Sequence, residues 1–451
     1  MNNRQQKEKG KIKSRSALAI LGIWIFILIL SGCEGINLPG IFASATPIPP
    51  TLAVKPTTAP NISATIFVPQ KTTGNAQDLI IWVPPQFNPD SETPASKLLK
   101  EQLNSFAAAN PGVKIITRVK AATGPAGLLS SLKSAKDAAT QAVPAIVLLS
   151  RSDLEAAASQ GLILPIDTLS SVIEEKDWYE YARQLSAIQG RTYGLPFGGD
   201  ALILVYRPTR VAGPPANWDN VSRQGQPVIF AAGDRQSLVT LNLYMTAGGT
   251  VTDEQQRPTI QPQALEKVLK IYFDGLVQNS FPNWLFQYQT ENQALQAYRE
   301  QKGQWLITWS SYYLAELPAD STAVVLPSLS PDKSSLTTGW VWALSDPQPD
   351  RRELSTRLAE HLVQAEFLAK WTPLSAALPV RPTTMEKWDS LTIQSLLNEI
   401  IATAKLIPGY ENLNTLGPIL QEAVGLVLKR ESDPIRASQG AVDRLSSPPT
   451  P

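Results

Sequence analysis

Residues 145–161 of the chain, AIVLLSRSDLEAAASQG, place an apolar run directly before a segment with helical features. The first six residues carry no charge, which is typical of a strand buried on both faces of a sheet. Ser152 and Glu155 have the spacing of a capping box, so we expect a helix that begins at Ser152 and ends at Gly161. The stretch therefore predicts a strand followed by a helix.

The same alternation extends toward the amino terminus. Two more short apolar segments, 79–83 (LIIWV) and 113–119 (VKIITRV), have the character of strands. Helical spacing followed by Asn-Pro-Gly marks 95–110, and 128–140 is helical as well. Strands that alternate with helices predict parallel β–α–β units with helices on both faces of the sheet. In such sheets, ligands lie beyond the carboxyl ends of the strands.

Four segments of the chain resemble the family 1 extracellular solute-binding proteins, the group that contains maltose-binding protein. They are LNSFAAANPGVKI (103–115), PAIVLLSRSDLEAAASQGLILPID (144–167), GRTYGLPFGGDALILVYRP (190–208) and LAEHLVQAEFLAKWTPLSAALPVRP (358–382). Their order along the chain agrees with the family. The resemblance implies an α/β fold, a two-lobe periplasmic-binding-protein-like clamshell of type II in which each lobe is a mainly parallel sheet flanked by helices.

The body of the chain, roughly 370 residues, is too large for one hydrophobic core, which favours two lobes. The resemblance places lobe 1 at 78–200 plus 325–375 and lobe 2 at 201–324 plus 376–445. Outside the quoted segments we expect a strand at 305–309. We also expect a last helix with Asp433 as its N-cap and Pro434 as its first residue.

The amino terminus has the features of a secretory signal. Six basic residues and one acid lie within the first fifteen positions, and a 14-residue apolar run follows at 17–30. An uncleaved transmembrane anchor is the alternative, but such a helix needs ~20 residues. Leu30-Ser31-Gly32-Cys33 resembles the lipobox of bacterial lipoproteins, which implies that 1–32 is removed and that Cys33 is lipidated. Cys33 is the only cysteine, so a disulfide within the chain is excluded.

Two segments differ in composition from the body. Residues 33–77 join the lipidated cysteine to the body and are rich in Pro and Thr, which predicts a semi-extended tether. Residues 446–451 (SSPPTP) are expected to form a disordered tail. Removal of the signal leaves 34 basic and 38 acidic residues, a net charge of about −4, with no basic run. Nucleic acid is therefore not an expected partner.

Polar and aromatic residues at the ends of the predicted strands are candidates for ligand binding. Trp82 ends the first strand, where it is either an aromatic shelf or part of the core. Phe197 and Asp200 lie in the LPFGGD turn, where the family often places an acid that contacts the ligand; a turn-capping role is the alternative for Asp200. Arg151 follows AIVLLS and is a candidate contact for a charged or hydroxylated ligand, with solvent as its default partner.

Two later strands supply the other candidates. Trp309 and Ser310 follow the apolar ITW segment, where relatives often have an aromatic platform, although this chain lacks the glycine pattern common there. Trp340 follows Thr338-Gly339 at a position where the family has a glycine-rich loop on the ligand side. Trp342 lies two residues further and so faces the same side of the strand. One of these two rings is expected to face the ligand and the other the core.

Several classes of site are excluded by composition. The chain has a single histidine, His361, which we interpret as a surface or interface residue of a helix. Without a second histidine or another cysteine, Ser-His-Asp, Cys-His and ordinary zinc sites are excluded, and we expect neither metal nor cofactor. The sequence has no phosphate-binding GxxxxGK[ST], so the chain itself does not hydrolyse ATP.

The resemblance implies a non-enzymatic, monomeric lipoprotein on the extracytoplasmic face of the bacterial cell membrane. It would capture a small polar ligand, expected to be a sugar, by hinge closure and deliver it to the permease of an ABC importer. Two alternatives stay open. One is a degenerate clamshell that serves as a sensor or scaffold, and the other is a carbohydrate-active hydrolase with paired carboxylates.

Overall fold

The computed structural model describes residues 77–138, 142–331 and 333–447. The signal, Cys33 and the tether up to residue 76 lie outside the described residues, as does the tail from 448. The first strand begins at Gln77 and the last helix ends at Ser446. In the described part of the chain, no helix combines the length and the apolar character needed to cross a membrane.

The first three strands confirm the predicted parallel units. They are β1 (Gln77–Val83), β2 (Val113–Val119) and β3 (Ile146–Ser150). Strand β1 lies between the other two and is parallel to both. Because β3 is buried except at its last residue, its uniformly apolar sequence follows from helices that cover both faces of the sheet.

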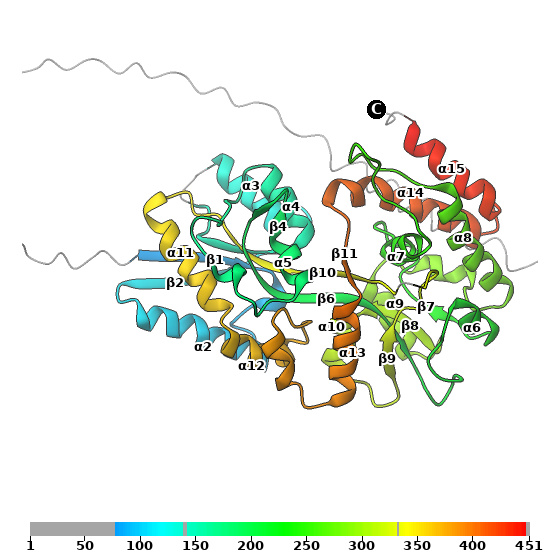
Figure 1. The fold of residues 1–451 in the computed structure, drawn as a ribbon, viewed down its shortest axis with the longest axis horizontal. Helices are drawn as coiled ribbons and strands as arrows, with labels where there is room; N and C mark the ends of the chain where they lie inside the picture. The colour runs from blue at the N-terminus through cyan, green and yellow to red at the C-terminus, as the bar shows by residue number, and fades with distance from the viewer. Residues whose placement is uncertain (1–76, 139–141, 332, 448–451) are drawn as a thin grey trace, which may run out of the picture. The chain divides into compact units, whose positions relative to one another are not determined.

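Helices cover both faces of this part of the sheet (Figure 1). On one face lie α2 (Pro94–Ala109), α11 (Pro349–Leu362) and α12 (Ala365–Ser375). On the other face lie α3 (Leu128–Ala138), α4 (Arg151–Ser159) and α5 (Glu180–Ser186). The predicted start of α4 at Ser152 is wrong. Ser150 is the N-cap, because its extended backbone lets its hydroxyl accept a hydrogen bond from the Asp153 amide at 3.2 Å.

Two long strands continue the sheet beyond β3. Strand β10 (Ser335–Leu344) is antiparallel to β3, and β6 (Leu195–Tyr206) is antiparallel to β10. The second half of β6 pairs with β8 (Trp305–Trp309) and β9 (Thr322–Val325), both antiparallel to it. Strand β6 is therefore shared by both ends of a nine-stranded sheet. The strand predicted at 305–309 is confirmed.

The remaining elements complete a mixed α/β fold. The other helices are α6 (Trp218–Arg223), α7 (Leu238–Thr246), α8 (Pro262–Val277), α9 (Glu291–Arg299), α10 (Ser310–Glu316), α13 (Leu391–Ala402), α14 (Tyr410–Leu428) and α15 (Pro434–Ser446). The short strands are β4 (Ala187–Ile188), β5 (Arg191–Thr192), β7 (Val228–Ile229) and β11 (Ala404–Leu406). The 3-10 helices are η1 (Pro85–Phe87), η3 (Val172–Glu174), η4 (Asn283–Gln287) and η5 (Pro382–Lys387). Asp433 caps α15 as predicted, accepting from the Arg436 amide at 3.0 Å.

Candidate functional site

The four central strands are buried along their length except at a few positions. Ser150 is the partly exposed residue of β3, and Trp309 is that of β8. Asp200 is the partly exposed residue of β6, and β10 has two such residues, Thr338 and Trp340. We call these five residues the central row.

The register of the sheet makes the central row continuous. Trp340 lies opposite Ser150 on β3, and Thr338 lies opposite Asp200 on β6. Trp309 pairs with Leu202, two residues beyond Asp200. Directly opposed residues share a face of the sheet. The cover of the sheet is therefore incomplete along one line that crosses four strands, and this line carries two indole rings, a carboxyl and two hydroxyls.

Two glycines before Asp200 allow neighbouring residues to pack closely against both faces of β6. A Cβ on Gly199 would lie 2.6 Å from Oη of Tyr181 in α5, and a Cβ on Gly198 would lie 2.9 Å from the Ala377 Cβ. The absence of side chains thus admits the chain's own residues on both faces. In the described structure, these glycines serve packing around the central row.

The Asp200 carboxyl is held by the start of α10. Its Oδ1 accepts hydrogen bonds from the Ser310 hydroxyl at 2.8 Å, from the Ser311 amide at 3.0 Å and from the Ala201 amide at 2.9 Å. Its Oδ2 accepts from the Ser311 hydroxyl at 2.5 Å. Burial raises the pKa of this carboxyl, and the four hydrogen bonds oppose that shift. Ser310, itself fully buried, therefore positions Asp200.

Two residues near Asp200 were missed by the sequence analysis. Glu291, the first residue of α9, has a pKa raised to about 7, mainly by burial and further by the charges of Asp200 and Asp234. Tyr312 on α10 is 36% exposed, and the charges of Glu291 and Asp200 help burial to raise its pKa. The sole signal in the sequence is the position of Glu291 directly after the N-cap Thr290, which predicts only a helix start.

Arg151 lies beside the central row, at the start of α4. Its Nη2 donates to the Ala187 carbonyl at 3.3 Å, and its Nη1 is 3.8 Å from the Glu155 carboxylate. Its Nε is buried and has no hydrogen-bond partner within the described ranges, and burial lowers the pKa of the Arg151 side chain. The predicted contact between Arg151 and a ligand stays a prediction, but the Nε–H group of its guanidinium is free to donate a hydrogen bond.

The structure places the other predicted aromatic residues in the core. Trp82 is 3% exposed, with the Lys120 ammonium 4.9 Å from its ring centroid. Phe197 is fully buried, and its ring centroid lies 4.1 Å from that of Trp371. Trp342 is fully buried against Phe197 as well.

Trp340 occupies the edge of this aromatic cluster. Its ring meets Phe87 edge to face at 5.3 Å between centroids, and the residue is partly exposed. The structure thus brings Trp340, Asp200, Trp309 and Ser310 together with Arg151 beside them, whereas Trp82 and Phe197 lie beneath the surface.

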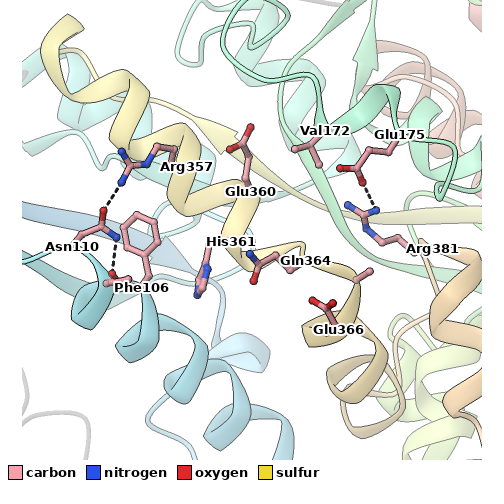
Figure 2. Close-up of a pocket in the computed structure, with 12 residues that line it drawn as sticks. Phe106, Asn110, Val172, Glu175, Arg357, Glu360, His361, Gln364, Glu366 and Arg381 are labelled. Carbon is pink, nitrogen blue, oxygen red and sulfur yellow. Dashed lines mark hydrogen bonds and ion pairs between the residues drawn. The ribbon is translucent and has the colours of Figure 1, made fainter.

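A pocket of about 530 Å³ lies between α2, α11 and the segment that contains η3, away from the central row (Figure 2). His361 lines it, with Nε2 2.8 Å from the Ser105 hydroxyl and 3.1 Å from the Gln102 carbonyl. Burial lowers the pKa of His361, and the hydrogen bond to the Gln102 carbonyl opposes that shift. The position of His361 between two helices agrees with the interpretation as an interface residue.

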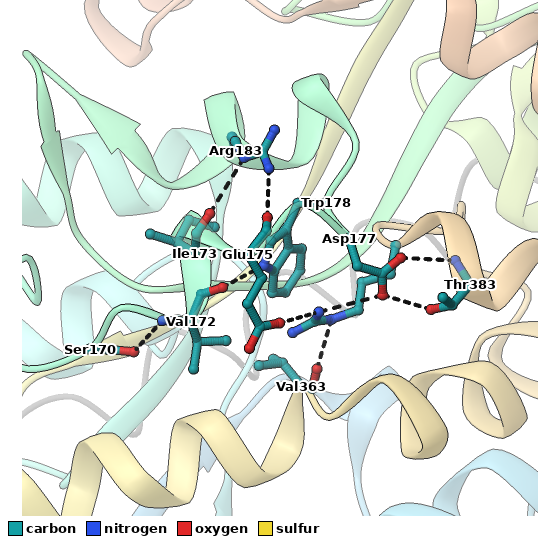
Figure 3. A network of polar contacts seen from close by, with 10 residues as sticks. Ser170, Val172, Ile173, Glu175, Asp177, Trp178, Arg183, Val363 and Thr383 are labelled. Atoms are coloured by element: carbon teal, nitrogen blue, oxygen red, sulfur yellow. Dashed lines mark hydrogen bonds and ion pairs between the residues drawn. The ribbon is translucent and has the colours of Figure 1, made fainter.

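One wall of this pocket is held in place by Arg381 (Figure 2), and Figure 3 shows the polar network around Glu175, Trp178 and Val363. Arg381 donates from Nη1 to Glu175 at 2.7 Å, and its Nε donates to the Val363 carbonyl at 3.0 Å. The guanidinium carbon lies 3.8 Å from the centroid of the Trp178 ring. The guanidinium is therefore occupied by the chain itself, which assigns Arg381 a structural role.

Comparisons with known proteins agree with this architecture. A family model described as bacterial extracellular solute-binding protein matches residues 101–390. Maltose-bound MalE3 of T. maritima has a TM-score of 0.66 at 17% identity, covering 82% of this chain and 99% of that chain. The cyclic alpha-maltosyl-1,6-maltose binding protein of Arthrobacter globiformis has a TM-score of 0.66 at 15% identity, covering 82% and 99%. The maltotriose-binding protein of Thermus thermophilus has a TM-score of 0.63 at 15% identity, covering 81% and 98%.

These likenesses confirm the predicted fold class, and at such low identity they show the fold alone. No curated protein sequence matches the chain.

Proposed function

Because the chain belongs to the bacterial extracellular solute-binding proteins, as its sequence resemblance predicted, we propose that it captures a small carbohydrate at the central row. A member of this family binds its solute and does not transform it, so the chain is not an enzyme. The central row, which crosses four strands at a line where their cover is open, is the observation that carries the proposal.

The chemistry of the row suits a sugar. The C–H faces of a sugar pack on aromatic rings, and its hydroxyls need donors and acceptors. Trp309 and Trp340 supply rings, and Thr338 and Ser150 supply hydroxyls. Asp200 supplies Oδ2, which has a single partner among the described residues and can accept a further hydrogen bond from the sugar.

The ligands of the similar structures support the same class. Those proteins are described as binding maltose, cyclic alpha-maltosyl-1,6-maltose and maltotriose. We carry over the class, a neutral oligosaccharide of glucose, and not one particular member.

Binding is expected to use closure of two lobes about the shared strands β6 and β10. We keep the predicted lobes but propose that the second part of lobe 2 begins after residue 388 rather than at 376. Leu378 exchanges two backbone hydrogen bonds with Gly199, and Tyr181 of α5 donates to the Pro379 carbonyl at 2.5 Å. Residues 376–388 thus pack on elements assigned to lobe 1.

The cellular setting follows from the amino terminus. We propose that 1–32 is cleaved, that lipid on Cys33 holds the monomeric protein at the extracytoplasmic face of the membrane, and that closed protein docks on an ABC permease. A cysteine with several acyl chains is a durable anchor, since each buried CH₂ contributes about 0.8 kcal/mol.

The test is isothermal titration of the full chain, purified in detergent, with glucose, maltose, maltotriose, polyols and amino acids. We expect saturable binding of a glucose oligosaccharide that Trp340→Ala weakens at least tenfold. Tyr410→Ala, a change at an aromatic residue that is 37% exposed and lies outside the central row, is the control and leaves affinity unchanged. A cooperatively folded protein that binds no carbohydrate at millimolar concentration would overturn the proposal.

A further inference from the structure

A cavity of about 240 Å³ lies between α9, β8 and α10, and Tyr312 is one of the residues that line it. Its floor is formed by Val205 of β6 and by Leu306 and Thr308 of β8. Val205 is paired with Leu306, and Thr308 follows two residues later, so the three side chains share one face of the sheet. The floor therefore extends along β8 toward its carboxyl end, where the central row lies.

The walls of the cavity combine three tyrosine rings with apolar and charged side chains. Helix α9 contributes Leu295 and Tyr298, and α10 contributes Tyr312 and Tyr313. Tyrosine rings offer apolar faces with a negative quadrupole, which attract both rings and cations.

The four charged residues of the lining form two ion pairs, Arg207 with Asp320 and Arg299 with Glu316. Arg207 donates to Asp320 at 2.7 Å and to the carbonyls of Gly303 and Tyr298. Its guanidinium carbon also lies 3.9 Å from the centroid of the Tyr298 ring. This cation has its charge and its donors satisfied and leaves nothing for a ligand to neutralise.

At the end of the cavity toward the carboxyl end of β8, Thr308 belongs to the lining, and Glu291 of α9 lies beside Thr308 without itself lining the cavity. Oε1 of Glu291 and Oγ1 of Thr308 are both buried and have no hydrogen-bond partner in the part of the chain that the structure describes. The Thr308 hydroxyl and the Trp309 backbone amide both lie close enough to the carboxyl to lower its pKa, but Oε1 has no hydrogen bond of normal geometry among the described residues. Glu291 precedes Leu295 by one helical turn, so its side chain lies on the face of α9 that lines the cavity.

The charge at this end is also uncompensated. Asp200 and Asp234 act on Glu291 as further negative charges. None of the ion pairs in the described part of the chain uses any of these three carboxyls. Among the described residues no three such side chains are arranged to hold a metal ion. A buried carboxyl without a counter-ion is costly, and an organic cation would relieve that cost.

We propose that this cavity binds a small aromatic amine, with the ammonium group against Glu291 and Thr308 and the ring between Tyr298, Tyr312 and Tyr313. The volume has room for one ring and a short chain. A primary ammonium has three donors, which match the free oxygens of Glu291 and Thr308. This site is additional to the sugar site of the central row and does not depend on it.

The probe is phenethylamine, and its neutral counterpart is 2-phenylethanol, each titrated calorimetrically into the full chain at pH 8. We expect saturable binding of phenethylamine and at least tenfold weaker binding of 2-phenylethanol. Glu291→Gln, which keeps the size of the side chain, should weaken phenethylamine at least tenfold and leave the alcohol unchanged. Glu300→Gln, at an exposed acid that ends the same helix, is the matched control and should change neither affinity.

Two further measurements test whether the Glu291 carboxylate itself holds the ammonium group. Because the pKa of Glu291 is about 7, phenethylamine should bind about tenfold more weakly at pH 6 than at pH 8, and this dependence should vanish in Glu291→Gln. Trp340→Ala should leave amine binding unchanged, so a failure of the sugar proposal does not affect this test. No saturable binding by a folded protein, or binding that survives Glu291→Gln at both pH values, would overturn the proposal.

Discussion

Ser311 donates two hydrogen bonds to Asp200, one from its amide to Oδ1 at 3.0 Å and one from its hydroxyl to Oδ2 at 2.5 Å. The two residues lie on different elements, α10 and β6, and 111 positions apart in the sequence. The Asp200 carboxyl, which belongs to the central row, therefore also fixes the start of the helix that carries Tyr312 and Tyr313. Any change at Asp200 acts on the sheet, on α10 and on both proposed sites at once.

Asp200→Ala should lower the free energy of unfolding by about 3 kcal/mol, since the change leaves four donors in a buried setting without their acceptor. Ser311→Ala removes one of these hydrogen bonds and should cost about 1 kcal/mol. Urea unfolding followed by tryptophan fluorescence measures both. Asp219→Ala, at an acid whose side chain is 80% exposed, is the control. An effect of Asp200→Ala no larger than that of the control would contradict the anchoring role.

The strands could be predicted from the sequence because each is a short apolar run between breaking residues. The predicted 113–119 and 305–309 coincide with β2 and β8, and 79–83 falls within β1. The relative directions of the strands could be predicted less well from the sequence. Strand β10 is antiparallel to β3, and no local pattern encodes this because the two strands are almost 200 residues apart.

The candidate site was only partly predictable, for the same reason. Asp200 and Trp340 were candidates because they lie at positions where the resembled family has residues on the ligand side. The environment of Glu291 is set by β6, β8 and the loop before α7, none of which is near it in the sequence. Phe197 was expected to face the ligand, but a register shift in β6 beside it and the ring of Trp371 place it in the core. Tertiary packing, which the local sequence does not contain, decides such positions.

Gly199→Ala should destabilise the protein by about 2 kcal/mol or more, because the new methyl group would lie 2.6 Å from the Tyr181 hydroxyl. Tyr181 cannot easily withdraw, since it is buried and donates to the Pro379 carbonyl. Gly440→Ala is the matched control. It lies within α15 with open space around it, and the change should stabilise by roughly 0.5–1 kcal/mol. Thermal melts of both variants test the pair. Equal shifts in melting temperature would show that the Tyr181 side chain moves to make room for the new methyl group.

Arg381→Lys should cost about 2 kcal/mol of stability although it preserves the charge. Lysine cannot stack on Trp178 and reach both Glu175 and the Val363 carbonyl as the guanidinium does. Arg436→Lys, at an arginine whose side chain is 85% exposed, should change stability by less than about 0.5 kcal/mol. Denaturant midpoints of the two variants give the comparison. If both variants unfold at the same midpoint, the network around Arg381 contributes no stability of its own.

Glu291 should make the stability of the protein fall as the pH rises. Its pKa is raised to about 7 in the folded state, from an ordinary value of 4.5. Below pH 4.5 the carboxyl is protonated in both states, so its contribution to stability is fully present. Between these two values the unfolded chain releases the proton while the folded chain keeps it, and the contribution is lost above pH 7.

Glu291→Gln should remove this dependence, because the amide is neutral at every pH. At about 1.4 kcal/mol per pKa unit, the variant should be more stable than the wild type by roughly 3 kcal/mol at pH 8 and by much less at pH 5. Urea unfolding at both pH values gives the difference directly, and groups that titrate identically in the two proteins cancel. Glu300→Gln, at a fully exposed acid, should show no such rise between pH 5 and pH 8. The stability difference between wild type and Glu291→Gln could instead be the same at both pH values. That result would mean that the Glu291 carboxyl is ionised and compensated in the folded protein. The amine site would then lack the uncompensated charge on which it depends.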